Sequence, residues 1–199
     1  MRLLSQRNQT KLNIMKKLYL ILISLIAAPL LGNAQQWSVG VNALDAANVG
    51  TISAEASVAA SRHITVNASV KVNPWTFNKG DGATQKQHRH QTYAVGMRWW
   101  PWNVYSGWWM GGKAQFQEYN WGGFRSRETE EGNAYGAGLS FGYTWMLHEH
   151  INLEAGAGVW GGYKTYTVYS CPKCGRKVDE GSKWFVMPNE AILSLVFVF

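Results

Sequence analysis

Apolar and polar residues alternate one by one along several stretches of this chain, and this periodicity restricts the fold more than any other feature. The clearest stretch covers residues 134–147. From 136 to 144 the even positions hold only Gly, Ser and Thr, while the odd positions hold the apolar set Tyr135, Ala137, Leu139, Phe141, Tyr143 and Trp145. Successive side chains of a strand point to opposite faces, so this pattern predicts a β-strand with one apolar face. The run is about twice as long as a typical soluble strand.

Seven further stretches show the same alternation, and none of the segments between them has the periodicity of a long helix. They are 37–46, 51–60, 64–73, 90–100, 108–119, 151–164 and 190–199. The connections also alternate in length. Short ones lie at 61–63, 101–107 and 148–150, whereas longer, polar ones lie at 74–89, 120–132 and 165–187, with a tight turn at 46–50. Short turns at one end and long loops at the other are typical of an up-and-down β-barrel.

The residues on the polar face distinguish two kinds of barrel. A soluble barrel buries its apolar face, whereas a membrane barrel turns that face to lipid and lines its interior with polar groups. Tryptophan and tyrosine near the strand ends match the aromatic girdles of membrane barrels. The polar face also carries three acids and three bases that can pair across a narrow lumen, namely Glu55, Lys71, Arg98, Lys113, Glu154 and Glu190. We therefore predict an all-β, eight-stranded antiparallel transmembrane barrel, with a soluble barrel or sandwich as the alternative.

Residues 1–34 have the features of a cleaved secretory signal peptide. Two lysines precede an apolar run at 18–31, which is shorter than the ~20 residues of a membrane-spanning helix. Gly32 and Ala34 suit cleavage after residue 34, and Met15 is the expected true start. The segment holds five basic residues and no acid, so its removal lowers the formal charge from +7 to +2. The basic character of the whole chain therefore does not indicate nucleic-acid binding.

The barrel domain that remains, residues 35–199, ends in an alternating apolar strand. Phe199, Phe197 and Leu195 occupy every second position up to the last residue. This ending resembles the signal that the outer-membrane assembly machinery reads on the last strand of its substrates. We therefore expect this machinery and outer-membrane lipid as partners. The predicted location is the bacterial outer membrane, with both termini in the periplasm and the long loops outside the cell.

Several segments together resemble a known family. They are VGVNALDAAN at 39–48, VNPWTF at 72–77, MRWWPW at 97–102, GNAYGAGLSFGYTWMLHEHINLEAGAGVWGGY at 132–163, YSCPKCG at 169–175 and the terminal ILSLVFVF. These segments are similar to small outer-membrane β-barrel proteins of unknown function from Bacteroides and its relatives. The resemblance implies an eight-stranded outer-membrane barrel and brings no established activity or catalytic residue. Genes of that family often neighbour those for fimbria-type surface components, which implies a role in surface assembly.

The sharpest local motif is C-P-K-C-G, which begins at Cys171 and includes Cys174. Two thiolates at this spacing can hold one side of a zinc ion, but a closed structural site needs four ligands and the chain has no second such pair. His88 and His90 lie beside another loop at the same predicted end of the barrel, so a Cys2His2 zinc site is geometrically possible. The alternatives are a local disulfide, which an oxidising compartment allows, and two free thiols.

The remaining candidate functions differ in the chemistry that they need. The spacing of the serine, histidine and aspartate residues in the chain does not indicate a Ser-His-Asp triad, so we do not predict an enzyme. Side chains just fill the interior of an eight-stranded barrel, and Trp160 and the inward charges add to the block. We predict a plugged barrel that acts as a surface scaffold, in which the loops 74–89, 120–132 and 165–187 contact a surface protein such as a fimbria-type component. A lipid-modifying outer-membrane enzyme and a narrow pore are the alternatives.

Overall fold

The computed structural model describes residues 36–78, 85–123, 128–171 and 175–199. Its elements are β1 (Trp37–Asn42), α2 (Ala43–Ala47), β2 (Ile52–Ser61), β3 (Ile64–Asn73), β4 (Thr76–Phe77), β5 (Lys86–Trp99), β6 (Gly107–Gly122), β7 (Thr129–His148), β8 (Ile151–Tyr169) and β9 (Lys177–Val198). The predicted signal peptide lies outside the described residues. None of the helices in the described part of the chain is long and apolar enough to cross a membrane.

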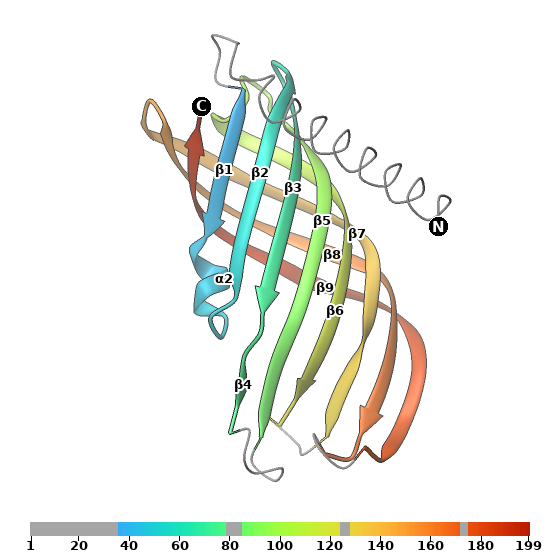
Figure 1. Cartoon of the computed structure of the whole chain (residues 1–199). Coiled ribbons are helices and arrows are strands. Elements are labelled where there is room, and N and C mark those ends of the chain that lie inside the picture. The colour runs from blue at the N-terminus through green and yellow to red at the C-terminus, as the bar shows by residue number, and fades with distance from the viewer. Residues whose placement is uncertain (1–35, 79–84, 124–127, 172–174) are drawn as a thin grey trace, which may run out of the picture. The chain divides into compact units, whose positions relative to one another are not determined.

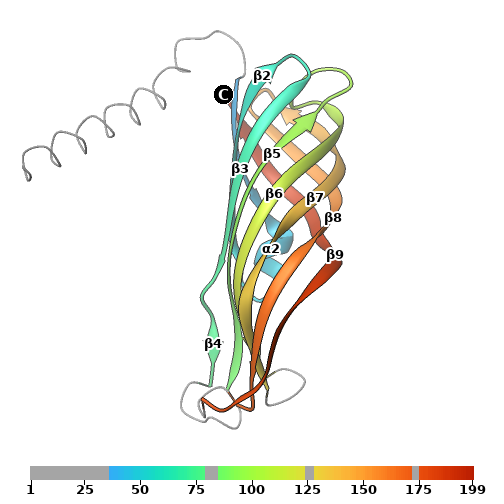
Figure 2. The same cartoon turned by 90° about the vertical axis from the view of Figure 1, so that its right-hand side faces the viewer.

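In the described part of the chain, eight antiparallel strands close into a barrel (Figures 1 and 2). Strands that follow one another in the chain pair, except that β3 pairs with β5 rather than with β4, and β1 closes the ring by pairing with β9. The two-residue β4 is a short addition at the edge of β5. The predicted all-β, eight-stranded antiparallel architecture is therefore confirmed. We call the end with the short connections after β2, β5 and β7 the turn end, and the opposite end the loop end.

One row of paired residues runs across all eight strands and shows how strongly the barrel is staggered. It starts at Phe197 on β9 and passes through Val39, Ala56, Ala68, Val95, Ala114, Ala137 and Gly161 before it reaches Val186. The row thus rejoins β9 eleven residues before its starting point (197 − 186 = 11). A closed barrel with such a stagger must have tilted strands. Every side chain in the row is apolar or absent.

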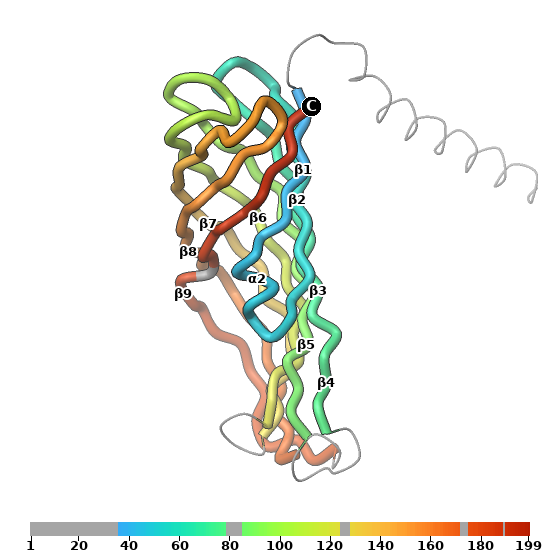
Figure 3. Tube along the Cα trace, turned by 90° about the vertical axis from the view of Figure 1, so that its left-hand side faces the viewer, coloured from blue at the N-terminus to red at the C-terminus, as the bar shows by residue number. Residues whose placement is uncertain are grey.

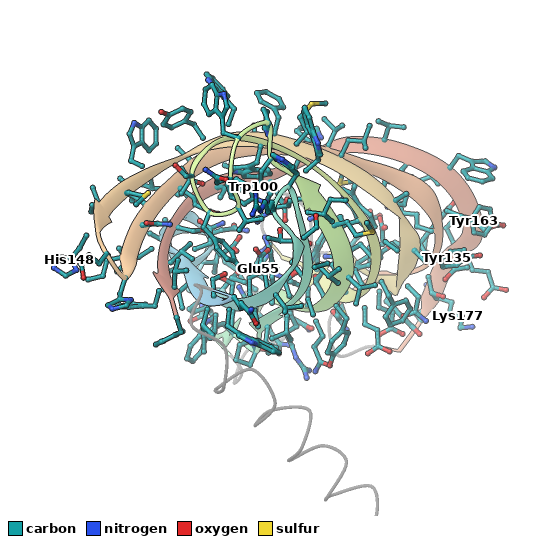
Figure 4. All side chains as sticks on the ribbon, turned by 90° about the horizontal axis from the view of Figure 1, so that it is seen from above. Glu55, Trp100, Tyr135, His148, Tyr163 and Lys177 are labelled. Carbon is teal, nitrogen blue, oxygen red and sulfur yellow. The ribbon has the colours of Figure 1, made fainter. Side chains whose placement is uncertain are left out.

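The apolar face of the barrel points outward and the polar face points inward. Leu139 and Phe141 are 70% and 60% exposed, whereas Glu154 is 2% exposed. Figure 4 shows Glu55 and Trp100 inside the ring of strands, with Tyr135 and Tyr163 on its outer side. The apolar side chains are therefore on the outside of the barrel, which is the orientation that the membrane-barrel prediction expects.

The strands reach much further toward the loop end than the sequence predicts. β9 begins at Lys177, within the expected loop 165–187, and β8 continues to Tyr169. β5, β6 and β7 likewise extend into the expected loops 74–89 and 120–132. The prediction ended each strand where its outward residues stopped being apolar. Backbone pairing does not require an apolar face, so the ladder continues through polar residues.

The first strand is shorter than predicted. The expected strand 37–46 ends at Asn42, and the chain turns into α2. Asn42 caps this helix, because its side chain accepts a hydrogen bond from the backbone N–H of Leu44 at 3.1 Å. The helix sequence, Ala-Leu-Asp-Ala-Ala, consists mostly of good helix formers and has no β-branched residue. As a result the β1–β2 hairpin stops well short of the loop end (Figure 1).

Candidate functional site in the barrel interior

The structure gathers the six predicted lumen charges into ion pairs inside the barrel. The first group is centred on Arg98, which lies 2.6 Å from Glu55 and 3.1 Å from Glu154. The guanidinium group of Arg98 also lies 4.2 Å from the centroid of the Trp109 ring. Thr144 donates a hydrogen bond to Glu154 at 3.2 Å. The charge of Arg98 is thus shared between two carboxylates and an aromatic face, as a buried cation requires.

The second group joins two lysines to two acids. Lys113 pairs with Glu190, and Lys71 lies 3.7 Å from the same carboxylate. Lys71 also pairs with Asp45 at 3.0 Å. Asp45 is not among the predicted lumen charges, because the alternation places it at the end of a strand, whereas α2 turns it inward. The cavity left among these groups is about 40 Å³, which holds only a few water molecules.

The turn end of the interior is filled by three aromatic side chains. Trp100, Tyr105 and Trp109 are at most 4% exposed, and the Trp100 ring lies 5.9 Å from that of Tyr105 and 6.3 Å from that of Trp109. Trp100 donates a hydrogen bond from Nε1 to Thr65 at 3.1 Å. Asn152 holds the segment in place by donating to the backbone carbonyl of Tyr105 at 2.8 Å. The connection after β5 therefore folds into the barrel.

This aromatic layer was not predicted, although the sequence contains a signal for it. Trp109 falls on the polar face of its strand, directly after the outward Trp108. Gly142 and Gly156 make the room that it needs, because a Cβ atom at Gly142 would lie 2.6 Å from the Trp109 ring. A bulky residue on an inward face opposite glycines is the pattern that would have identified it.

A second aromatic layer lies on the loop side of the charges. Tyr119, Ala134 and Trp160 are buried together, and the Trp160 ring lies 4.6 Å from that of Phe185. Along β6 the order is Trp109, Lys113 and then Tyr119, so the ion pairs lie between two aromatic layers. Trp160 thus lies on the inward face, as its position in the alternation predicts.

Beyond this layer, on the inner face of the strand extensions, Glu130 accepts two hydrogen bonds. Tyr119 donates to it at 2.8 Å and Lys164 at 2.7 Å. Burial raises the pKa of the Glu130 carboxyl, but the two hydrogen bonds outweigh this effect and the pKa is lowered. Burial and the neighbouring Glu130 raise the pKa of the Tyr119 hydroxyl well above its ordinary value. Glu130 is therefore an anion and Tyr119 a neutral donor at physiological pH.

The two histidines singled out as metal ligands lie on the same inner face. The His88 ring stacks on Trp121 at 5.8 Å and meets the His90 ring edge-on at 5.3 Å. Burial, followed by the charges of His88 and Lys71, lowers the pKa of His90 to about 4. Within the described ranges, no three His, Cys, Asp or Glu side chains form a group suited to a metal ion.

Cys171 is disulfide-bonded, whereas Cys174 lies outside the described residues. Cys171 and Gly175 border a polar cavity of about 730 Å³ at the loop end, whose other walls include Gln85, Gln87 and Thr129. Because zinc binds the thiolate form of cysteine, a disulfide sulfur is not one of its ligands. Zinc binding by this motif therefore stays a prediction that applies to the reduced protein.

The residues of the expected assembly signal lie on the outer face of the last strand. Leu195, Phe197 and Phe199 are 38%, 42% and 64% exposed. Phe197 pairs with Val39 on β1, and the backbones of Phe199 and Trp37 exchange hydrogen bonds of 3.2 and 2.8 Å. This strand therefore forms the seam at which the barrel closes. Recognition of this last strand by the outer-membrane assembly machinery stays a prediction.

The fold and the interior together define a closed eight-stranded antiparallel β-barrel with an apolar outer face and a lumen that holds paired charges. The chain belongs to the family described as "Protein of unknown function (DUF3575)", whose model matches residues 19–199. No curated protein and no solved structure matches the chain.

Proposed function

We propose that this protein is an outer-membrane barrel with a sealed lumen that presents its loop end to a protein partner at the cell surface. The observation that carries the proposal is the sharp boundary on the outer face. Five aromatic residues on adjacent strands form one paired row, which we call the aromatic row: Tyr93, Phe116, Tyr135, Tyr163 and Trp184. The next outward row toward the loop end is entirely polar: Gln91, Glu118, Asn133, Thr165 and Ser182.

Such a boundary is the pattern expected where hydrocarbon gives way to the polar interface. On the turn side of the aromatic row the outward side chains are apolar and broadly exposed, with Val95 at 62%, Met110 at 61% and Leu139 at 70%. In water, a belt of this kind would far exceed the few hundred Å² of contiguous apolar surface that monomeric proteins show. In lipid it is the favourable arrangement. The charges inside the barrel would then be shielded from lipid by the wall.

The interior supports a scaffold better than a pore. Two aromatic layers with ion pairs between them fill the lumen, and the cavity among the charges is only about 40 Å³. The polar strand extensions beyond the aromatic row are then the part of the molecule available to a partner. We propose this surface role without catalysis, and a fimbria-type component remains the partner that the family resemblance implies.

The location is tested by cell fractionation and by electrophoresis with and without boiling. A folded membrane barrel migrates differently before and after heating, so we expect two positions on the gel and recovery in the outer-membrane fraction. Recovery in the soluble periplasmic fraction with a single gel position would contradict the proposal. The surface role is tested by shortening the three loop-end segments 74–89, 120–132 and 165–187 together, which should abolish partner binding and leave the heat-dependent shift intact.

A further inference from the structure

The last strand has an unpaired edge toward the loop end. β1 pairs with β9 only from Ser194 to Val198. From Lys177 to Met187, β9 pairs with β8 on one side, and within the described residues no strand lies along its other side. Figure 3 shows β9 continuing past α2 toward the loop end. The cause is the short β1–β2 hairpin, which ends before the neighbouring strands do.

The edge is covered close to α2 and uncovered further on. Asn42 bonds to the backbone of Ala191 and Leu193 at 3.0 Å each. Pro188 has no N–H, and the ladder to β8 shifts register beside it. Proline and register shifts are common ways to protect a strand edge from pairing. The stretch from Lys177 to Met187 has no proline and is eleven residues of nearly regular strand.

We propose that this edge of β9 binds an extended segment of another protein, which adds to the sheet as an antiparallel strand. The inference rests on the proposed surface role and specifies the partner's form. Main-chain hydrogen bonds would supply affinity, and cross-strand side chains would set the register. On the inner face, Lys183 favours an acid opposite it and Asp179 favours a base. Phe185, which is half-buried, favours an apolar residue.

A second copy of this chain does not suit the edge equally well. Antiparallel pairing of two identical strands places the twofold axis perpendicular to the sheet. That axis would turn the second barrel upside down, whereas all copies enter one membrane in the same direction. A segment from a different protein is free of this constraint. Trp184 and Val186 flank the edge on the outer face and are 77% and 83% exposed, so an added strand would find side chains to pack against.

The first test uses a synthetic peptide and the full chain refolded in lipid nanodiscs. The peptide TVTETFTKT, aligned antiparallel to residues 178–186, puts an acid opposite Lys183, a base opposite Asp179 and an apolar residue opposite Phe185. We expect saturable binding by calorimetry. Exchanging the two charges, in TVTKTFTET, should weaken binding about fivefold, and N-methylation of alternate peptide amides should abolish it. Equal binding of the methylated peptide, or none of the parent peptide, would overturn the proposal.

A pair of protein variants provides a matched control. Successive N–H groups of a strand point to opposite edges. Of the two variants Gly181→Pro and Ser182→Pro, one therefore removes an N–H that faces β8, and the other removes an N–H on the open edge. We expect the variant that removes the open-edge N–H to keep the heat-dependent gel shift and lose peptide binding about tenfold. Full binding by both variants would refute strand addition. Concentration-dependent dimers that this variant abolishes would assign the edge to a second copy and likewise refute it.

Hydrogen exchange on the wild-type protein needs no variant. We expect every second amide between 177 and 187 to exchange fast in the free protein and to become protected when the peptide binds. Slow exchange at all of them before peptide is added would show that the edge is already covered, and would overturn the proposal. A normal gel shift in a protein that fails these tests removes only strand addition, and leaves the membrane barrel standing.

Discussion

The side chain of Asn42 accepts a hydrogen bond from the backbone N–H of Leu193 at 3.0 Å and so takes the place of a strand residue. Its Nδ2 group donates to the carbonyl of Ala191 at 3.0 Å, and its Oδ1 atom also accepts from the N–H of Leu44. The ladder between β1 and β9 therefore continues for one step after the chain has turned into α2. One amide side chain both ends the strand and protects the seam.

Two replacements of Asn42 should weaken the contact between β1 and β9 to different degrees. Asn42→Asp keeps the acceptor and loses the donor to Ala191, whereas Asn42→Ala loses both. We expect a loss of unfolding free energy of about 1–3 kcal/mol for Asn42→Ala, and a smaller loss for Asn42→Asp. Urea unfolding in detergent micelles measures both. Asn48→Ala, at an exposed position after the same helix, should change little. An unchanged midpoint for Asn42→Ala would show that the seam does not depend on it.

Loss of Arg98 should lower the stability of the barrel, because it leaves two buried acids without a counter-charge. Arg98→Met leaves Glu55 and Glu154 without their shared cation, and we expect a loss of about 3–5 kcal/mol. The triple variant with Glu55→Gln and Glu154→Gln should recover much of that loss, since no uncompensated charge remains. Urea midpoints of the three proteins decide this. A single variant as stable as wild type would mean that the ion pairs add nothing.

Two glycines on the neighbouring strands β6 and β7 should differ sharply in their tolerance of a methyl group. A Cβ atom at Gly136 would lie 2.1 Å from the carbonyl oxygen of Gly161, whereas one at Gly112 would meet only Leu139 at 3.8 Å. We expect Gly136→Ala to lower the urea midpoint by about 1 M or to prevent folding, and Gly112→Ala to fold normally. Similar midpoints for the two variants would contradict the close approach of β7 and β8.

If the lumen is sealed as we propose, the wild-type protein should not conduct in planar bilayers. Trp100 and Trp109 fill only the turn end, and the ion pairs and the second aromatic layer remain in the double variant Trp100→Ala/Trp109→Ala, so we expect this variant not to conduct either. Trp108→Ala is the control, because Trp108 is 54% exposed on the outer face and should leave conductance unchanged. Conductance of the wild-type protein would favour the pore alternative over the scaffold.

Acid should weaken the part of the barrel around His90. This residue lies three positions beyond the aromatic-row residue Tyr93, and burial lowers its pKa to about 4 from an ordinary 6.5. Between these values the unfolded chain binds a proton that the folded chain excludes, so stability falls as pH drops from 6.5 toward 4. His90→Gln should flatten this part of the stability curve. An equally steep curve in the variant would assign the acid sensitivity to other groups.

The alternation of side chains was enough to establish which residues face inward. Strand geometry fixes a period of two, so once a strand is recognised, Arg98 and Glu154 must lie on the face opposite Trp99 and Leu153. That local rule explains why all six predicted lumen charges lie inside the barrel. It does not state which charge meets which, because partners such as Lys113 and Glu190 come from strands that only closure of the barrel brings together.

The sequence by itself thus determined the number of barrel strands, their two faces and the barrel, since each follows from local periodicity. Only the tertiary structure decided where β9 begins, because pairing with β8 holds polar residues such as Ser182 in a strand. It also decided that Trp100 and Tyr105 fold into the lumen and that α2 turns Asp45 toward Lys71. These arrangements depend on space and partners contributed by distant segments, and no local pattern of the chain records them.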